Sequence, residues 1–230
     1  MISRRRFLGL SLSTIALEKL SFTNSLAASL PSSADISHGP RTKKEIALTF
    51  HGAGDLSIAK DLLAITKDSN TPITVMAVGS WLHANPQIGK EILAGGHDLG
   101  NHTYNHKAML HLNLKEAQAE IEKGKAAIKA SVGSTQKYFR PSGTPKSNSI
   151  IRKAAIASGY SNCITYDVDT LDYQDPKASA IVTNCMKSIK NGSIVSLHFG
   201  HKNTVTALPK LITELKSAGL TPVTLSTLLS

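Results

Sequence analysis

The stretch Gly100-Asn101-His102-Thr103-Tyr104-Asn105-His106 carries two histidines separated by three residues, directly after a short apolar segment with the pattern of a strand. On one helical turn or in a tight loop, this spacing lets two imidazoles converge on one divalent ion. Histidines with the same spacing also occur as unrelated surface residues, so the pair alone does not decide the matter. The residues around other predicted strands have to be considered with it.

Further polar residues follow other predicted strands in the same way. They are His51 and Asp55 after one strand, Arg140 after a second, Asp169 and Asp172 after a third, and His198 after a fourth. In barrels of alternating strands and helices, active sites are built where the strands end. These positions favour one site at the carboxyl ends of the strands.

Strand and helix patterns alternate along the chain. Strands are expected at 45–50, 72–78, 97–99, 137–140, 161–166, 193–197 and 222–225. The clearest helix begins at Asn113, with an apolar face expected to point into the barrel that consists of Leu114, Ala117, Ile121, Gly124 and Ile128. The alternation predicts a parallel sheet, either closed as a barrel or open and doubly wound.

The first 28 residues have the order of features of an export signal. Ser3–Gly9 contains a twin-arginine pattern, Leu10–Leu17 is moderately apolar, and Ser25–Ala28 offers small residues for cleavage. We therefore expect a twin-arginine signal peptide over 1–28 and export to the periplasm, the cell envelope or the medium. Glu18 and Lys19 cut the apolar run short, so no membrane span is expected to remain after cleavage.

Residues 29–43 are rich in proline, serine and glycine and are expected to form a linker, with a single domain over 44–230. Without residues 1–28, 22 basic and 15 acidic residues remain, a net charge of +7. The lysines are dispersed and aromatic residues are few, which argues against nucleic-acid binding. An anionic polymer of the envelope suits an exported basic domain better.

Cys163 and Cys185 are the two cysteines of the chain. Export would permit a disulfide between them. Cys163 also lies in a strand pattern, where a free thiol serves as a small apolar side chain. Both alternatives remain open at this point.

Five segments, taken in order, resemble the motifs of the polysaccharide deacetylase family, whose fold is the NodB homology domain and which is also called carbohydrate esterase family 4. They are Thr49-Phe50, Asn101–His106, Phe139–Gly143, Tyr166–Tyr173 and Ser193–His198. The resemblance covers about residues 44–230. It implies a distorted (β/α)7 barrel and metal-assisted hydrolysis of an acetyl amide.

The same resemblance implies roles for particular residues. His102 and His106 correspond to metal ligands, and imidazole suits zinc best here, with cobalt or nickel as alternatives. His198 corresponds to the catalytic acid. Asp169 is expected to orient His198, with Asp172 as the second candidate. Arg140 is expected to hold the catalytic base in place, because its donor fork is rigid and always charged.

The first motif departs from the family. Members carry Asp-Asp-Gly after Thr-Phe, the first aspartate as base and the second as metal ligand, whereas this chain has His51-Gly52-Ala53-Gly54-Asp55. In one possible arrangement of the altered site, the glycines let Asp55 reach the metal while His51 serves as the catalytic base. In the other, His51 is the third metal ligand and Asp55 is a base or has no role. We expect the first arrangement, because it keeps a carboxylate on the ion.

The expected function is therefore that of an exported, metal-dependent hydrolase that removes acetyl groups from a peptidoglycan-like or chitin-like glycan. One alternative is hydrolysis of a non-peptide C–N bond in a small amide. A second alternative is a deacetylase-like protein that binds glycan without catalysis, because the Asp-Asp-Gly segment is missing.

Overall fold

The structure, a computed structural model, describes residues 35–230, so the expected signal peptide and the beginning of the expected linker lie outside the described residues. The strands are β1 Asp35–Ile36, β2 Glu45–Gly52, β3 Thr74–Ala77, β4 Asp98–Asn101, β5 Cys163–Ile164, β6 Val168–Asp169, β7 Ile194–His198 and β8 Thr221–Val223. The helices are α1 Leu56–Asp68, α2 Gly79–Ala84, α3 Pro86–Ala94, α4 Leu114–Val132, α5 Ser149–Ala157, α6 Ala178–Ser188, α7 Lys202–Ser217 and α8 Leu225–Leu228. Two short 3-10 helices are η1 Met109–His111 and η2 Asp172–Gln174.

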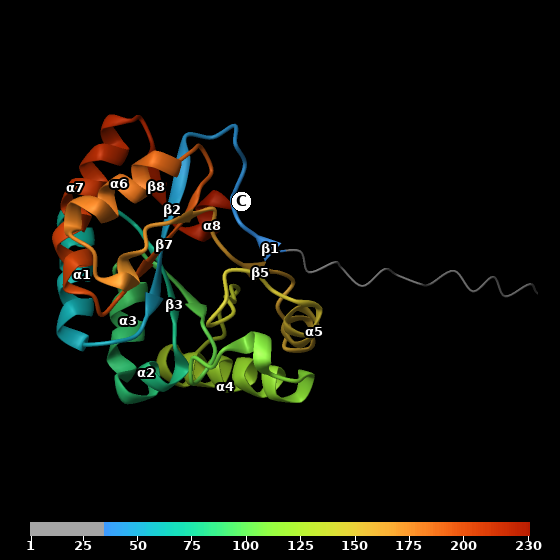
Figure 1. Ribbon diagram of the computed structural model, residues 1–230. Coiled ribbons are helices and arrows are strands. Elements are labelled where there is room, and N and C mark those ends of the chain that lie inside the picture. The colour runs from blue at the N-terminus through green and yellow to red at the C-terminus, as the bar shows by residue number, and fades with distance from the viewer. Residues whose placement is uncertain (1–34) are drawn as a thin grey trace, which may run out of the picture. The chain divides into compact units, whose positions relative to one another are not determined.

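The strands pair in parallel and are surrounded by the helices (Figure 1). The main sheet has the order β4-β3-β2-β7-β6, and β8 pairs with the beginning of β2. Single bridges through Phe139 continue the sheet from β4 to β5, and β5 pairs with β1. Within residues 35–230 no ladder joins β5 to β6, so the expected (β/α)7 barrel is present in a form that is open on that side.

The helices cover the sheet in two groups. α1, α6 and α7 form one group and α2, α3, α4 and α5 form another, and both groups pack around the outside of the sheet (Figure 1). In β2 the side chains alternate: Ile46, Leu48 and Phe50 pack in the large core under the helices. Thr49 and His51 therefore point to the opposite face, the interior of the barrel, because successive strand residues face opposite sides.

The predicted strands have counterparts, with two differences. The expected strand 137–140 is reduced to single bridges at Phe139, which pairs with Asn101 on one side and with Cys163 on the other. The two-residue strands β1 and β6 were not expected, and neither were the short helices α2 and α8. Segments this short have no periodicity that a sequence pattern could reveal.

Most of the apolar face predicted for helix α4 is buried in the structure. Asn113 caps the helix and forms a capping box with Glu116, and Gly133 ends it in a left-handed conformation. Ala117, Ile121, Gly124 and Ile128 are buried, as expected. Leu114 is the exception, since it is 44% exposed at the first turn of the helix.

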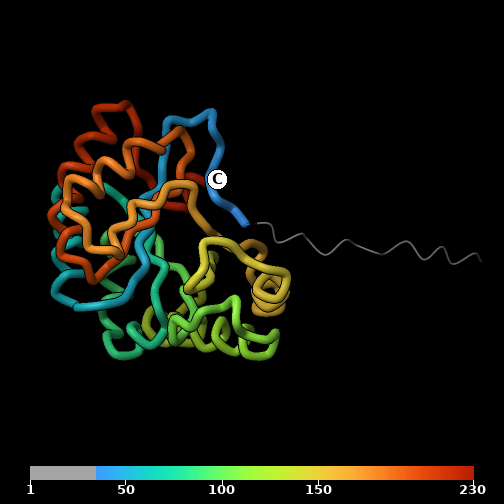
Figure 2. The backbone as a smooth tube through the Cα atoms, in the orientation of Figure 1, coloured from blue at the N-terminus to red at the C-terminus, as the bar shows by residue number. Residues whose placement is uncertain are grey.

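The residues 35–43, expected as part of a linker, belong to the fold. Asp35 and Ile36 pair with β5, and Arg41 forms a salt bridge of 2.6 Å with Asp167. The backbone trace in Figure 2 shows the C-terminus beside this segment. The side chain of Leu228 lies against Gly39. The described domain therefore begins before residue 44.

Cys163 and Cys185 are both buried and free, and burial raises the pKa of their thiols to about 11 and about 12. They therefore serve as small apolar side chains. Among the described residues, no helix is long and apolar enough to span a membrane.

Candidate metal centre

Three imidazoles meet at the carboxyl ends of the barrel strands. His51 lies in β2, His102 directly follows β4, and His106 lies in the loop after it. One ring nitrogen of each lies within 4.8 Å of the others. We call His51, His102 and His106 the histidine cluster. The sheet brings the histidine cluster together because β3 pairs in parallel with both β2 and β4, so the carboxyl ends of the three strands lie side by side.

Hydrogen bonds set the protonation of the two inner histidines. His102 Nδ1 lies 2.9 Å from the carbonyl oxygen of Arg140 and must donate to it, which leaves Nε2 without a proton in the neutral ring. Arg140 donates to His51 Nε2 over 3.3 Å, so in neutral His51 the proton sits on Nδ1. That nitrogen lies 2.8 Å from His102 Nε2 and donates to it.

The environment keeps the cluster neutral. Burial is the main cause that holds the pKa values of His51 and His102 well below the ordinary value of 6.5, and it also lowers that of His106. The neighbouring imidazoles and the Arg140 guanidinium add to the effect on His51. Neutral imidazole is the form that binds a metal ion. The cluster is therefore in its ligand state at neutral pH.

The donor set fits a divalent transition metal. Three neutral imidazole nitrogens suit zinc, and they also suit cobalt or nickel, so the set does not choose among these ions. His51 and His106 also line an open groove, which leaves one side of the cluster accessible to water and substrate. An ion held by His51 Nδ1 and His102 Nε2 would take the place of the proton between these two nitrogens. Neutral His51 would then carry its proton on Nε2, and the hydroxyl of Ser196, 3.2 Å away, could accept that hydrogen bond in place of the one that Nε2 accepts from Arg140.

Asp55, expected as the metal ligand, lies outside the histidine cluster. It is exposed and caps helix α1, where its carboxylate accepts a 2.7 Å hydrogen bond from the backbone N–H of Ser57. The hydrogen bonds with Ser57 also lower the pKa of Asp55. The placement favours the alternative arrangement, in which His51 is the third ligand.

The two glycines of the altered motif serve the packing of the loop rather than a turn toward the metal. A Cβ atom at Gly52 would lie 2.7 Å from Val75 Cγ1, and one at Gly54 would lie 2.7 Å from Gly200 Cα. Gly54 also has a φ of 99°, and its carbonyl accepts a hydrogen bond from the Trp81 indole. These contacts fix the path of the segment between β2 and α1.

His198 forms its hydrogen bond with Asp172, not with Asp169 as expected. Its Nδ1 lies 2.7 Å from Asp172 Oδ1, and its ring stacks on that of His51 with centroids 4.3 Å apart. Asp169 instead accepts a hydrogen bond from the Leu171 N–H. The reason is the chain between them: Leu171 takes a left-handed φ of 57° and starts η2, which turns Asp172 toward β7.

Arg140 is buried and contacts the residue at the place of the family's base. Besides the bond to His51, its guanidinium donates to the Thr49 hydroxyl over 2.8 Å and to the carbonyls of Ile164 and Thr165. Burial lowers the pKa of Arg140 to about 10, and the negative charge of Asp169 opposes that effect. Arg140 thus remains a cation that contacts the His51 ring and fixes its orientation.

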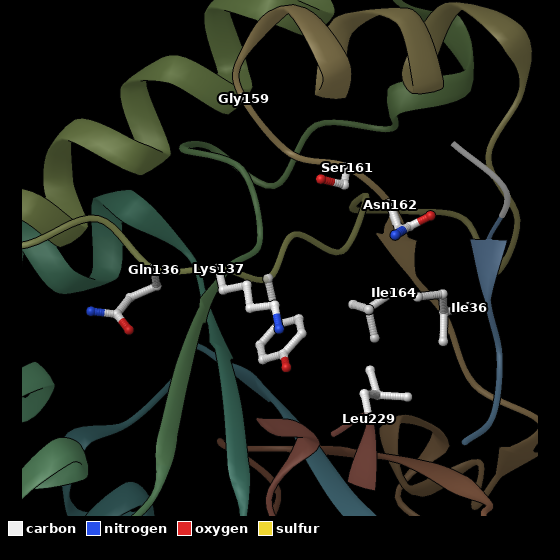
Figure 3. A pocket seen from close by; sticks show the side chains of 9 residues that line it. Ile36, Gln136, Lys137, Gly159, Ser161, Asn162, Ile164 and Leu229 are labelled. Atoms are coloured by element: carbon white, nitrogen blue, oxygen red, sulfur yellow. The ribbon is translucent and has the colours of Figure 1, made fainter. Parts of the chain in front are cut away.

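A groove of about 280 Å³ lies over the cluster. Its lining includes His51, His106, His198 and His201, together with Ala53, Gly54, Val78, Phe199 and Gly200. His201 follows β7, and its Nδ1 lies 2.7 Å from Asp175 Oδ1 at the rim of the groove. A separate pocket of about 260 Å³, lined by residues such as Ile36, Lys137 and Leu229, shares none of these residues (Figure 3). The reacting groups therefore face the first groove.

Sequence reasoning missed several residues that support the site. Ser196 contacts His51, and Thr204 donates to Asp172 over 2.7 Å. Ser196 precedes His198 by two residues in β7 and therefore lies on the same face of the strand, a signal that the sequence contains. Thr204 lies in the first turn of α7, and no sequence pattern connects it with Asp172.

Comparison with known proteins identifies the family. The family model of polysaccharide deacetylase matches residues 38–163. The chain belongs to the polysaccharide deacetylase family. A peptidoglycan-N-acetylglucosamine deacetylase from Bacillus cereus is 32% identical over 194 residues, which are 83% of this chain and 90% of that protein.

Solved structures similar to this chain include a protein described as a pseudoenzyme and a protein described as a deacetylase. A carbohydrate esterase family 4 pseudoenzyme from Bacillus anthracis superposes with a TM-score of 0.81 at 28% identity, over 86% of this chain and 70% of that one. That protein has also been solved as a mutant with restored enzymatic activity. A peptidoglycan N-acetylglucosamine deacetylase superposes with a TM-score of 0.78 at 29% identity, over 84% of this chain and 91% of that one.

Proposed function

We propose that this polysaccharide deacetylase family member is an exported hydrolase that removes acetyl groups from an N-acetylated envelope glycan, with a divalent ion held by His51, His102 and His106. The observation that carries the proposal is the convergence of these three imidazoles beside the His198–Asp172 pair. An ion bound there would supply a Lewis acid for the acetyl carbonyl and lower the pKa of a bound water.

His198 is the proton-transfer group in this proposal. Asp172 accepts a hydrogen bond from the Nδ1–H of His198, which leaves Nε2 as the nitrogen that exchanges protons with water and with the departing amine. The buried carboxylate of Asp172 stabilises the imidazolium form of His198 when Nε2 takes up a proton. If His51 is a ligand, no separate base remains in the altered motif, so His198 both accepts the proton from water and delivers it to the leaving nitrogen.

The substrate class follows from three observations. The groove over the cluster is open, which suits a chain-like substrate, and the domain is basic, which suits an anionic envelope polymer. The relatives from Bacillus cereus and the solved deacetylase are named for N-acetylglucosamine in peptidoglycan. We therefore propose a peptidoglycan-like glycan as substrate, with chitin-like oligomers as the simplest assay compounds.

The proposed cellular location rests on the twin-arginine pattern around Arg4 and Arg5. A reporter fused behind residues 1–34 is expected to leave the cytoplasm, and Arg4→Lys with Arg5→Lys is expected to retain it there. Retention of both reporters in the cytoplasm would contradict export by this route.

The activity is tested by acetate release from N-acetylated chito-oligosaccharides and from peptidoglycan fragments. We expect release that a chelator abolishes and that added zinc restores, and no release by a variant with both His102→Ala and His106→Ala. Protein that holds one equivalent of zinc but releases no acetate from either substrate would contradict the deacetylase function. Turnover of small amides in place of the glycans would point to the related C–N bond hydrolysis.

A second candidate is glycan binding without catalysis. The specific observation in its favour is the replacement of both aspartates of the first motif by His51 and Gly52, together with the similarity to a pseudoenzyme. Binding to peptidoglycan in a pull-down without acetate release, by both the wild-type protein and His198→Ala, would support this candidate.

A further inference from the structure

Glu120 of α4 is a buried carboxylate that contacts the loop bearing His102 and His106. It is 4% exposed. Its Oε2 accepts the backbone N–H of Asn105 over 2.8 Å, and its Oε1 accepts the side-chain amide of the same residue over 3.1 Å. Lys107 Nζ lies 3.6 Å from Oε1. A charge this deeply buried is costly unless it is paired and hydrogen-bonded, and here its hydrogen-bond partners all belong to the loop.

The loop needs support from outside because its backbone is strained. Thr103 has a φ of 66° and His106 a φ of 55°, both in the left-handed region. For residues other than glycine this conformation costs about 1–2 kcal/mol each. Asn105, the residue that Glu120 holds, directly precedes His106. The contacts of Glu120 therefore act on the segment that determines where the His106 imidazole points.

The helices α2 and α4 provide the rest of the support. The N–H groups of Gly79 and Ser80, at the start of α2, donate to the carbonyls of Thr103 and Tyr104. On the other side, a Cβ atom at Gly124 of α4 would lie 2.9 Å from the Thr103 carbonyl oxygen. The two helices thus define the path of the loop as far as Tyr104. Glu120 holds the next residue, through its N–H.

We propose that Glu120 is a positioning residue for the metal centre: by holding Asn105, it places His106 where its imidazole can join those of His51 and His102. The inference rests on the proposed metal centre. Groups that orient metal ligands typically account for a 10- to 100-fold change in metal affinity. Removing the carboxylate is therefore expected to weaken binding of the ion without touching a ligand.

The test compares zinc affinity, measured by calorimetric titration, among purified variants. Glu120→Ala is expected to bind zinc about 10- to 100-fold more weakly than the wild-type protein. Glu120→Gln is expected to recover most of the affinity, because its amide oxygen can accept the Asn105 N–H and its amide can donate to a turned Asn105 side chain. Glu122→Ala is the matched control, since it removes an exposed carboxylate from the same helix.

A second readout does not depend on metal. Hydrogen exchange of the Asn105 amide in the metal-free protein is expected to accelerate in Glu120→Ala and to stay at the wild-type rate in Glu122→Ala. If Glu120→Ala does not fold, Glu120→Asp replaces it, and its shorter side chain is expected to give weaker zinc binding than Glu120→Gln. If folded Glu120→Ala, or Glu120→Asp in its place, binds zinc as tightly as Glu122→Ala does, the positioning role of Glu120 is overturned. The proposed metal centre is not affected by that result. A wild-type protein with no affinity for zinc would overturn the proposed metal centre itself.

Discussion

The imidazole of His198 and the carboxylate of Asp172 are joined twice, because Asp172 accepts both the ring Nδ1–H and the backbone N–H of His198, each over 2.7 Å. Asp172 is completely buried, and the Thr204 hydroxyl provides a third hydrogen bond to it. The carboxylate therefore fixes both the tautomer and the orientation of the His198 ring.

Asp172→Asn is expected to lower the rate constant for acetate release by about 10²–10⁴-fold, the range typical of a general acid–base group, because the amide cannot stabilise the His198 imidazolium. Asp169→Asn is the matched control, since Asp169 accepts a hydrogen bond from Leu171 and does not contact His198. We expect a loss of less than about tenfold there. Steady-state kinetics on one chito-oligosaccharide checks both variants, and a larger loss in Asp169→Asn would return the orienting role to that residue.

The altered first motif leads to a prediction about metal affinity. His51→Ala is expected to weaken zinc binding strongly, because it removes one of the three imidazoles of the cluster. Asp55→Ala is expected to leave zinc affinity unchanged and to lower the free energy of unfolding, because it removes the cap of α1. Asp55→Asn keeps a capping side chain and should be nearly neutral in both measurements. Titration calorimetry and denaturant unfolding separate the two effects, and the reverse order of zinc affinities would favour Asp55 as ligand.

A third prediction concerns Gly52, which occupies the position of the family's metal-binding aspartate. Gly52→Ala and Gly52→Asp are both expected to destabilise the fold by about 1–3 kcal/mol, as is typical of overpacking, because their Cβ atoms meet Val75 and the backbone of Ala77. Val75→Ala combined with Gly52→Ala should lose less stability than the sum of the single changes, since it removes the closest atom. Urea unfolding of the four variants measures this, and strict additivity would show that the two positions do not compete for space.

The sequence predicted the alternation of strands and helices because the longer elements carry a clear apolar period, as in β2 and α4. It could not predict which of two neighbouring carboxylates meets His198. That choice depends on the left-handed backbone of Leu171, which no side-chain pattern reveals. The short segments β1, β6 and α2 were missed for a similar reason.

The placement of Asp55 and His51 was within reach of the sequence. Asp55 precedes a helical pattern, which is the position of an N-cap, and capping occupies the carboxylate that the metal would need. The alternation of β2 also places His51 on the same face as Thr49, opposite Ile46, Leu48 and Phe50. The preference for a carboxylate on the ion outweighed these two local signals.

A last prediction concerns the pH dependence of stability through His97, which lies outside the site. It is buried, its Nδ1 accepts the N–H of Ile73 over 3.3 Å, and its Nε2 lies 3.3 Å from the Thr66 hydroxyl. Burial lowers the pKa of His97 below 6.5, and the opposing effect of Asp98 is smaller. The unfolded chain therefore binds a proton at a higher pH than the folded protein does. The stability contributed by neutral His97 is complete above about pH 6.5 and is lost as the pH falls toward its folded pKa.

His97→Asn keeps an acceptor for the Ile73 N–H but does not titrate. Between pH 7.5 and pH 5.5, metal-free wild-type protein is expected to lose more stability than this variant, by at most about 1.4 kcal/mol per pH unit. Urea unfolding of both proteins in the presence of chelator at several pH values measures the difference in their free energies of unfolding. The contribution of the histidine cluster is the same in both proteins and cancels in this difference. Equal slopes for the two proteins would mean that His97 has the same proton affinity in the folded and unfolded states.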